Sequence, residues 1–125
     1  MTENEVAKIF VDCCYKVHTT LGPGLFESIY ESALLYELRQ CNLRVVQQME
    51  LPVIYEDVNL GIGFRADIVI ENKVIIEIKS VAAIAPVHYK QLLTYLKLTE
   101  LKLGFLVNFN EARIKDGLHR MVNNL

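Results

Sequence analysis

The sequence predicts an α/β fold whose mixed sheet holds both antiparallel and parallel strands. Apolar residues recur every three or four positions near the N-terminus, which is typical of amphipathic helices. Apolar and polar residues alternate in two runs between residues 60 and 79, which is typical of a β-hairpin. A helical pattern then separates this hairpin from a continuous apolar run. The order strand, helix, strand predicts a parallel pair joined by a right-handed crossover.

The composition is that of one domain over residues 1–125. With 52% hydrophobic residues, a chain of this length can bury a core without disulfides or metal. The formal net charge of −2 argues against a broadly basic surface that coats nucleic acid, but leaves room for a local basic groove. No run resembles a membrane span or a signal peptide. Cys13, Cys14 and Cys41 lack metal-ligand spacing, and we interpret them as small buried residues of a cytoplasmic protein.

Two helices are predicted at the N-terminus. Thr2 and Glu5 have the spacing of a capping box, so a first helix begins here and runs to about Thr20. The segment Gly22–Gly24 contains two glycines and a proline, which end this helix. A second helical pattern covers residues 25–41.

The second helix, for which Asn42 is the expected C-cap, carries a carboxylate in its first turn. Glu27 shares a stripe with Tyr30 and with apolar residues that should face the sheet. Spacing alone favours a carboxylate that complements the positive end of the helix dipole. The charged hairpin described below leads us to expect that Glu27 points towards Asp67 instead.

Three strands are predicted to form an antiparallel meander. Residues 44–55 have an extended pattern, a turn follows at residues 56–59, and a long strand covers residues 60–70. Residues 71–73 then turn the chain into a third strand that begins at Val74.

The C-terminal third completes the sheet. A helix is predicted over residues 86–99, with a proline in its first turn, and residues 103–107 have the pattern of a strand covered on both faces. Asp116-Gly117 is typical of a tight turn and predicts a short strand over residues 119–122, with a terminal helix as the alternative. One stripe of the helix over residues 86–99 carries three polar residues: His88, Gln91 and Tyr95.

Three charged residues interrupt the apolar hairpin. If residues 71–73 form a three-residue loop, Asp67 lies opposite Glu77, and Lys79 lies on the same face. A two-residue loop would instead pair Asp67 with Ile76 and send the two carboxylates to opposite faces. Carboxylates about 4 Å apart on a partly buried face repel by about 4 kcal/mol. Lys79, a raised pKa or a divalent cation could offset this repulsion.

Four segments of the sequence carry a family resemblance. Gly24–Tyr30, Arg65–Asp67, Glu77–Lys79 and Gln91–Lys97 together resemble the GxxExxY protein family, a set of small prokaryotic proteins in the PD-(D/E)XK nuclease superfamily. The resemblance implies a restriction-endonuclease-like αβββαβ core, here with an additional N-terminal helix. It also implies a metal-dependent nuclease that acts on DNA.

The resemblance further implies the roles of individual residues. Mg²⁺, with Mn²⁺ as a substitute, would be bound by the carboxylates and by one backbone carbonyl. The family motif has proline before its aspartate, and Ala66 stands there in this sequence, a difference that removes no ligand. The implied metal ligands are Asp67, Glu77, the backbone carbonyl of Ile78 and, directly or through water, Glu27. The implied catalytic residues are Asp67, Glu77, Lys79, which would assist the attacking water, and Gln91 with Tyr95.

Two alternatives to a nuclease remain open from the sequence. The first is a catalytically inactive nuclease-fold module that binds nucleic acid or protein. The second is a purely structural interpretation, in which His88, Gln91 and Tyr95 form a satisfied polar seam and an exposed sheet edge makes a homodimer.

Overall fold

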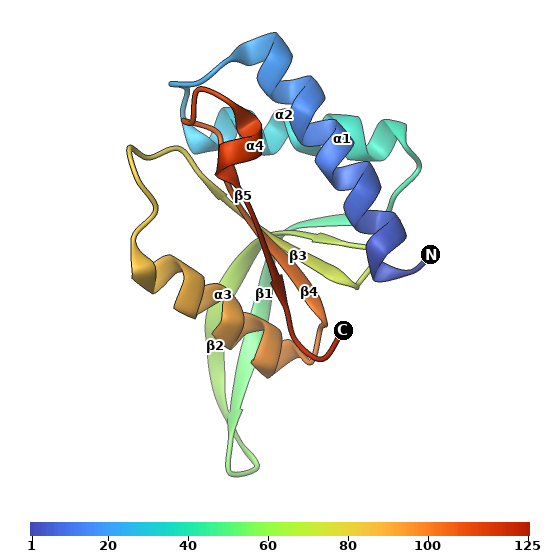
Figure 1. Ribbon diagram of the computed structural model, residues 1–125. Helices are drawn as coiled ribbons and strands as arrows, with labels where there is room; N and C mark the ends of the chain where they lie inside the picture. Colours follow the sequence, from blue (N-terminus) through green and yellow to red (C-terminus); the bar gives the residue numbers. More distant parts are fainter.

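A computed structural model covers residues 1–125 and confirms the α/β fold class (Figure 1). Four helices surround a five-stranded mixed sheet. No helix is long and apolar enough to span a membrane. The elements, in chain order, are α1 (Glu3–Leu21), α2 (Glu27–Gln40), β1 (Val45–Tyr55), β2 (Val58–Ile70), β3 (Val74–Lys79), α3 (Pro86–Thr99), β4 (Leu103–Asn108), α4 (Ile114–Gly117) and β5 (Leu118–Val122).

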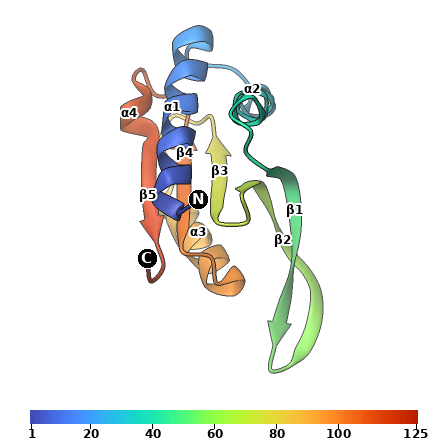
Figure 2. The ribbon, with the colours of Figure 1, turned by 90° about the vertical axis from the view of Figure 1, so that its right-hand side faces the viewer.

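The strands lie side by side in the order of the chain, from β1 at one edge to β5 at the other. Only β3 and β4 are parallel, as the helical crossover through α3 requires. Helices α1 and α2 lie across the sheet from α3 (Figures 1 and 2). The core is accordingly divided in two: 21 buried residues pack beneath α1, α2 and α4, and six pack beneath α3. The predicted meander and crossover are confirmed.

The register between β2 and β3 is the one that a three-residue loop sets. Ile70 pairs with Val74 and Ile68 pairs with Ile76, so the two-residue alternative is wrong. Because side chains alternate across a strand, this register decides which face carries each charged residue of the hairpin.

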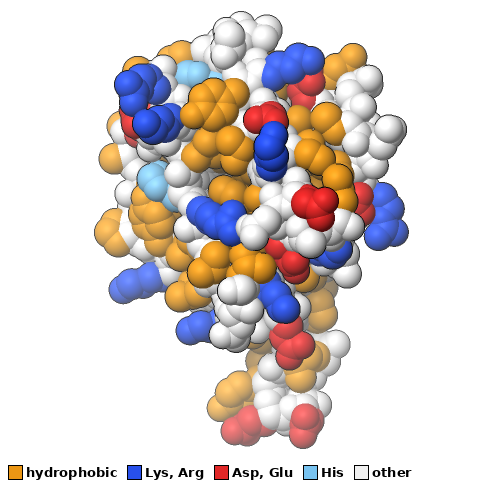
Figure 3. All heavy atoms as spheres, turned by 45° about the vertical axis from the view of Figure 1, so that its right-hand side comes forward, with side chains coloured by type: hydrophobic (Ala, Val, Ile, Leu, Met, Phe, Trp, Pro, Cys, Tyr) orange, Lys and Arg blue, Asp and Glu red, His pale blue; other side chains and the backbone are white.

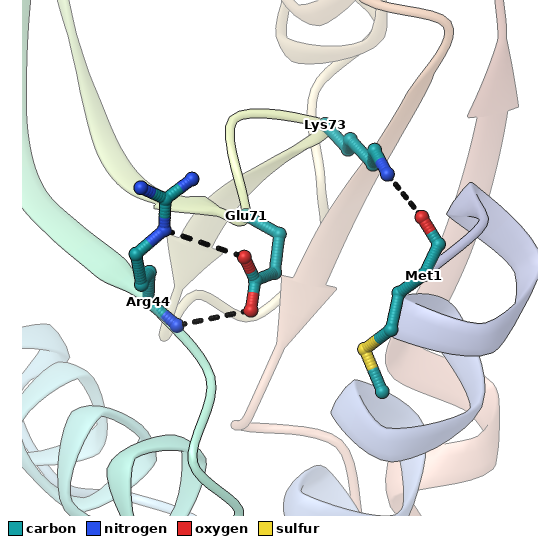
Figure 4. Close-up of polar contacts among 4 residues, drawn as sticks. All are labelled: Met1, Arg44, Glu71 and Lys73. Atoms are coloured by element: carbon teal, nitrogen blue, oxygen red, sulfur yellow. Dashed lines mark hydrogen bonds and ion pairs between the residues drawn. The ribbon is translucent and has the colours of Figure 1, made fainter.

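The loop between β2 and β3 is held by polar contacts at both sides (Figure 4). Glu71 and Asn72 both have left-handed backbones, with φ of 53° and 52°. The carboxylate of Glu71 accepts a hydrogen bond from the backbone N–H of Arg44 at 3.3 Å and pairs with the Arg44 guanidinium at 3.5 Å. The ammonium of Lys73 donates to the carbonyl oxygen of Met1. These contacts tie the loop to the start of β1 and to the N-terminus.

Three local expectations need correction. The turn between β1 and β2 comprises only Glu56 and Asp57, whose φ of 49° and 66° suit a two-residue hairpin, so β2 begins earlier than expected. Asp116 lies in the helical turn α4, where its N–H donates to the carbonyl of Arg113 at 3.0 Å, and not in a hairpin turn. Cys41 is exposed rather than buried, because it lies just beyond the end of α2.

The outer part of the β1–β2 hairpin projects from the body of the molecule (Figures 2 and 3). Strand β3 pairs with only the last residues of β2, so the preceding residues of β2 pair with β1 alone. We call residues 52–63 the ribbon. Five hydrophobic side chains of the ribbon are more than half exposed: Ile54, Tyr55, Val58, Leu60 and Ile62.

Tyr30 joins the start of α2 to the loop that precedes it. Its hydroxyl donates to the carbonyl of Gly22 at 2.6 Å and accepts from the backbone N–H of Leu25 at 3.1 Å. Its ring is fully buried and stacks on Phe109, with centroids 4.5 Å apart. The hydroxyl therefore satisfies backbone groups of the loop that leads into Glu27.

We expect Tyr30→Phe to lower the free energy of unfolding by about 1 to 3 kcal/mol, because the substitution leaves two backbone groups of the loop without their partner. Urea denaturation monitored by circular dichroism measures this change. Tyr36→Phe is the matched control, since Tyr36 lies on the same helix, is 62% exposed and makes no side-chain hydrogen bond. Equal stabilities of the two variants would contradict the role assigned to the Tyr30 hydroxyl.

Candidate functional site

The register of the hairpin brings Asp67 and Glu77 to one face of the sheet. Ile76 and Ile78 pack in the larger core beneath α1 and α2, so Glu77 between them faces α3. Asp67 lies on the same side, because its charge and hydrogen bonding act on Glu77. Lys79 follows Glu77 by two residues on β3 and therefore shares its face. The predicted meeting of the three charged residues on one face is therefore confirmed.

Asp67 lies where the regular backbone pairing between β2 and β3 stops, one residue beyond the Ile68–Ile76 pair. Its Oδ2 accepts a hydrogen bond from the backbone N–H of Ile78 at 2.8 Å, and its Oδ1 accepts one from Nε2 of Gln48 at 3.1 Å. Each carboxylate oxygen can accept a further bond. The carboxylate is thus oriented by donors from two strands and retains capacity to bind a cation.

Glu77 is the most deeply buried carboxyl group of the site, with 9% of the residue exposed. Its pKa is raised to about 8, chiefly by burial and also by the charge and hydrogen bonding of Asp67, while the charge of Lys79 opposes the change. Its Oε1 is buried and has no hydrogen-bond partner. A buried oxygen without a partner beside a second carboxylate is a donor set that fits a divalent cation.

Tyr95 places a phenol beside the two carboxylates. Its ring stacks on Phe64 with centroids 4.0 Å apart, which fixes the side chain between α3 and β2. Burial raises the pKa of Tyr95, and the negative charges of Glu77 and Asp67 add to this effect. The hydroxyl consequently stays protonated at neutral pH and can act as a donor.

The other polar residues of the α3 stripe are less closely tied to the site. Gln91 is exposed and makes no hydrogen bond, and the buried Nδ1 of His88 has no partner. Neither bonds to Tyr95, so the satisfied polar seam of the structural alternative is not present.

Glu27 is connected to the end of β3 and not, as we expected, to Asp67. Its Oε2 accepts from the backbone N–H of Ser80 at 3.2 Å, while the Ser80 hydroxyl donates to the carbonyl of Leu25 at 2.6 Å. The first turn of α2 is therefore fastened beside Lys79. This geometry reflects where α2 starts, since the helix begins at Glu27 itself.

The carboxylate of α2 that is linked to Asp67 is Glu31, which the sequence analysis missed. Glu31 Oε1 accepts from Nε2 of Gln48 at 2.9 Å, and its Oε2 accepts from Nε2 of Gln47 at 2.5 Å. The available signal was helical spacing, because Glu31 lies one turn after Glu27 on the same side of the helix. The two glutamines could be placed only once the register of β1 was known.

Two carboxylates, and no larger cluster, define the candidate cation site. No group of three or more His, Cys, Asp or Glu side chains lies close enough to hold a metal ion together. A cation bound by Asp67 and Glu77 would take its other ligands from backbone oxygens and water, which is the usual arrangement for Mg²⁺.

Comparison with known families assigns the chain. Residues 4–121 match the PD-(D/E)XK nuclease superfamily, and the chain belongs to that superfamily. No significant match was found among curated proteins or among solved structures. The family supports a nuclease, and nucleases of this superfamily generally use divalent metal ions.

The stability of the metal-free protein should fall as the pH rises from about 5 to about 8. The folded state holds a proton on Glu77 up to its pKa of about 8, whereas the unfolded chain releases that proton near the ordinary value of 4.5. The folded state therefore binds more protons across this window, and its stabilisation is lost as the pH passes through the folded pKa. The loss should be on the order of 4 kcal/mol.

Urea denaturation at several pH values, in the presence of a chelator, measures this dependence. Glu77→Gln should abolish most of it, because the amide does not titrate. Glu50→Gln is the control, since the Glu50 side chain is 52% exposed on β1 and the variant should keep the wild-type slope. A wild-type protein whose stability is flat over this window would refute the proton on Glu77.

Proposed function

We propose that the protein is a Mg²⁺-dependent nuclease that hydrolyses phosphodiester bonds of DNA in the cytoplasm. The observation that carries the proposal is the pair formed by the half-buried Asp67 and the buried Glu77, in which one oxygen of Glu77 has no partner. Within the superfamily we assign the chain to the GxxExxY family, on the motif Gly24, Glu27 and Tyr30.

Asp67 and Glu77 would hold the cation, with the backbone carbonyl of Ile78 as a third ligand and Mn²⁺ as a substitute ion. Glu27 would join through water from its place beside Ser80. When bound, a divalent cation polarises the phosphate and lowers the pKa of a bound water. Cation binding would also displace the proton of Glu77, because a carboxyl group must be deprotonated to bind a metal ion.

Three further residues, Lys79, Tyr95 and Gln91, would act on the attacking water or on the phosphate of the substrate. Lys79, on the same face as the carboxylates, would orient the attacking water or stabilise the negative charge that develops on the phosphate. Tyr95 would donate a hydrogen bond from its protonated hydroxyl. Gln91 is exposed on the same helix and would contact the phosphate backbone.

Mn²⁺ should raise the melting temperature of the wild-type protein, because the ion binds the folded state preferentially. Asp67→Asn should lose this response and, without metal, should keep or raise the melting temperature at pH 8, since it removes a charge that repels Glu77. Thermal unfolding with and without millimolar Mn²⁺ measures both effects. A destabilised Asp67→Asn protein and a wild type without any metal response would indicate a nuclease fold that has lost its cation site.

Lys79→Met should reduce cleavage of DNA by about 100-fold or more, because a charge that acts in the transition state is lost. Its affinity for Mn²⁺ should not fall, since Lys79 is not a ligand and its positive charge beside Glu77 opposes a bound cation. The assay uses single-stranded DNA, double-stranded DNA and RNA with purified protein, and calorimetry provides the metal affinity. Mn²⁺ binding without cleavage of any substrate would favour the inactive binding module over the nuclease.

A further inference from the structure

Gln48 occupies an irregular position in strand β1. The neighbouring residues are regularly paired, Gln47 with Ile68 and Met49 with Ala66, which leaves Gln48 opposite Asp67 without regular pairing. The backbone of Gln48 has φ of 51°, in the left-handed region that residues other than glycine rarely adopt. A conformation of this kind within a strand is strained, and such strain concentrates at functional sites.

The side chain of Gln48 hydrogen-bonds to two carboxylates from this position. Its Nε2 donates to Oδ1 of Asp67 at 3.1 Å and to Oε1 of Glu31 at 2.9 Å. One amide nitrogen therefore bridges a carboxylate of α2 and a carboxylate of β2. Gln47 donates to the other oxygen of Glu31 and makes no bond to Asp67.

The bridge completes the orientation of Asp67. The backbone N–H of Ile78 holds Oδ2, so with Gln48 on Oδ1 both oxygens have a fixed donor from a different strand. A carboxylate held in this way cannot rotate freely, and its remaining lone pairs keep one direction. The donor from Ile78 belongs to the backbone, whereas the donor from Gln48 is a side chain that substitution can remove.

We infer that Gln48 is a positioning residue, which holds the Asp67 carboxylate in the orientation that binds the cation and is itself anchored to α2 by Glu31. The inference rests on the proposed function, because it concerns the affinity of that same site for metal. Gln48 touches neither the cation nor the substrate. Groups that hydrogen-bond to a metal ligand typically change metal affinity by about 10- to 100-fold when they are removed.

The test is the affinity of the full-length protein for Mn²⁺, measured by calorimetry for wild type, Gln48→Ala and Gln48→Gly. Both variants should bind Mn²⁺ about 10-fold or more weakly. Glycine accepts the left-handed backbone, so Gln48→Gly should melt, without metal, at or above the temperature of Gln48→Ala. Gln47→Ala is the matched control, since it removes the adjacent amide that bonds only to Glu31, and should bind Mn²⁺ within about threefold of wild type.

The outcomes separate the possible failures. If the wild type binds Mn²⁺ and Gln48→Gly binds it equally well, Gln48 has only a structural role and the inference is overturned, while the proposed function stands. If the wild type binds no Mn²⁺, both the proposed cation site and the role of Gln48 are refuted. Weak binding by Gln48→Gly together with a melting temperature close to that of wild type supports the inference, because a purely structural role cannot produce that combination.

Discussion

The structure of the site follows from the burial of one carboxyl group beside another. Glu77 lies on a central strand of the sheet, where water cannot solvate its charge, and Asp67 lies across from it. Two charges in such a place repel strongly, so one carboxyl group takes up a proton. Two neighbouring side chains add to this arrangement. Tyr95 contributes a neutral hydrogen-bond donor, and Lys79 contributes a positive charge on the same face.

Several parts of the molecule could be predicted from residues that act locally. The alternation of polar and apolar residues determined β2 and β3, and the length of the loop at Glu71, Asn72 and Lys73 set their register and so brought Asp67 to Glu77. The continuous apolar run of β4 indicated a strand covered on both faces. Proline in the first turn marked the start of α3 at the right residue.

Other parts depend on contacts between distant segments, and the sequence could not supply them. The bridge from Glu31 through Gln48 to Asp67 joins three elements, and no local pattern signals that a glutamine in a strand will take a left-handed backbone. The prediction for the orientation of Glu27 was wrong for a similar reason, because this orientation depends on where Ser80 lies after β3. Gly117, at the end of the short helix α4, packs so closely on the Asn108 carbonyl that a Cβ would lie 2.2 Å from that oxygen, and the dipeptide Asp116-Gly117 does not signal this contact with β4.

The ribbon gives the molecule two regions of unequal cooperativity. Within the ribbon, strands β1 and β2 pair only with each other, and a two-stranded ribbon in water is marginal by itself. Its amide hydrogens should therefore exchange with solvent through local opening, while those of β3 and β4 exchange only when the whole domain unfolds. The carboxylate pair lies on the cooperative side of this boundary, so motion at the far end of the ribbon can take place without disturbing the site.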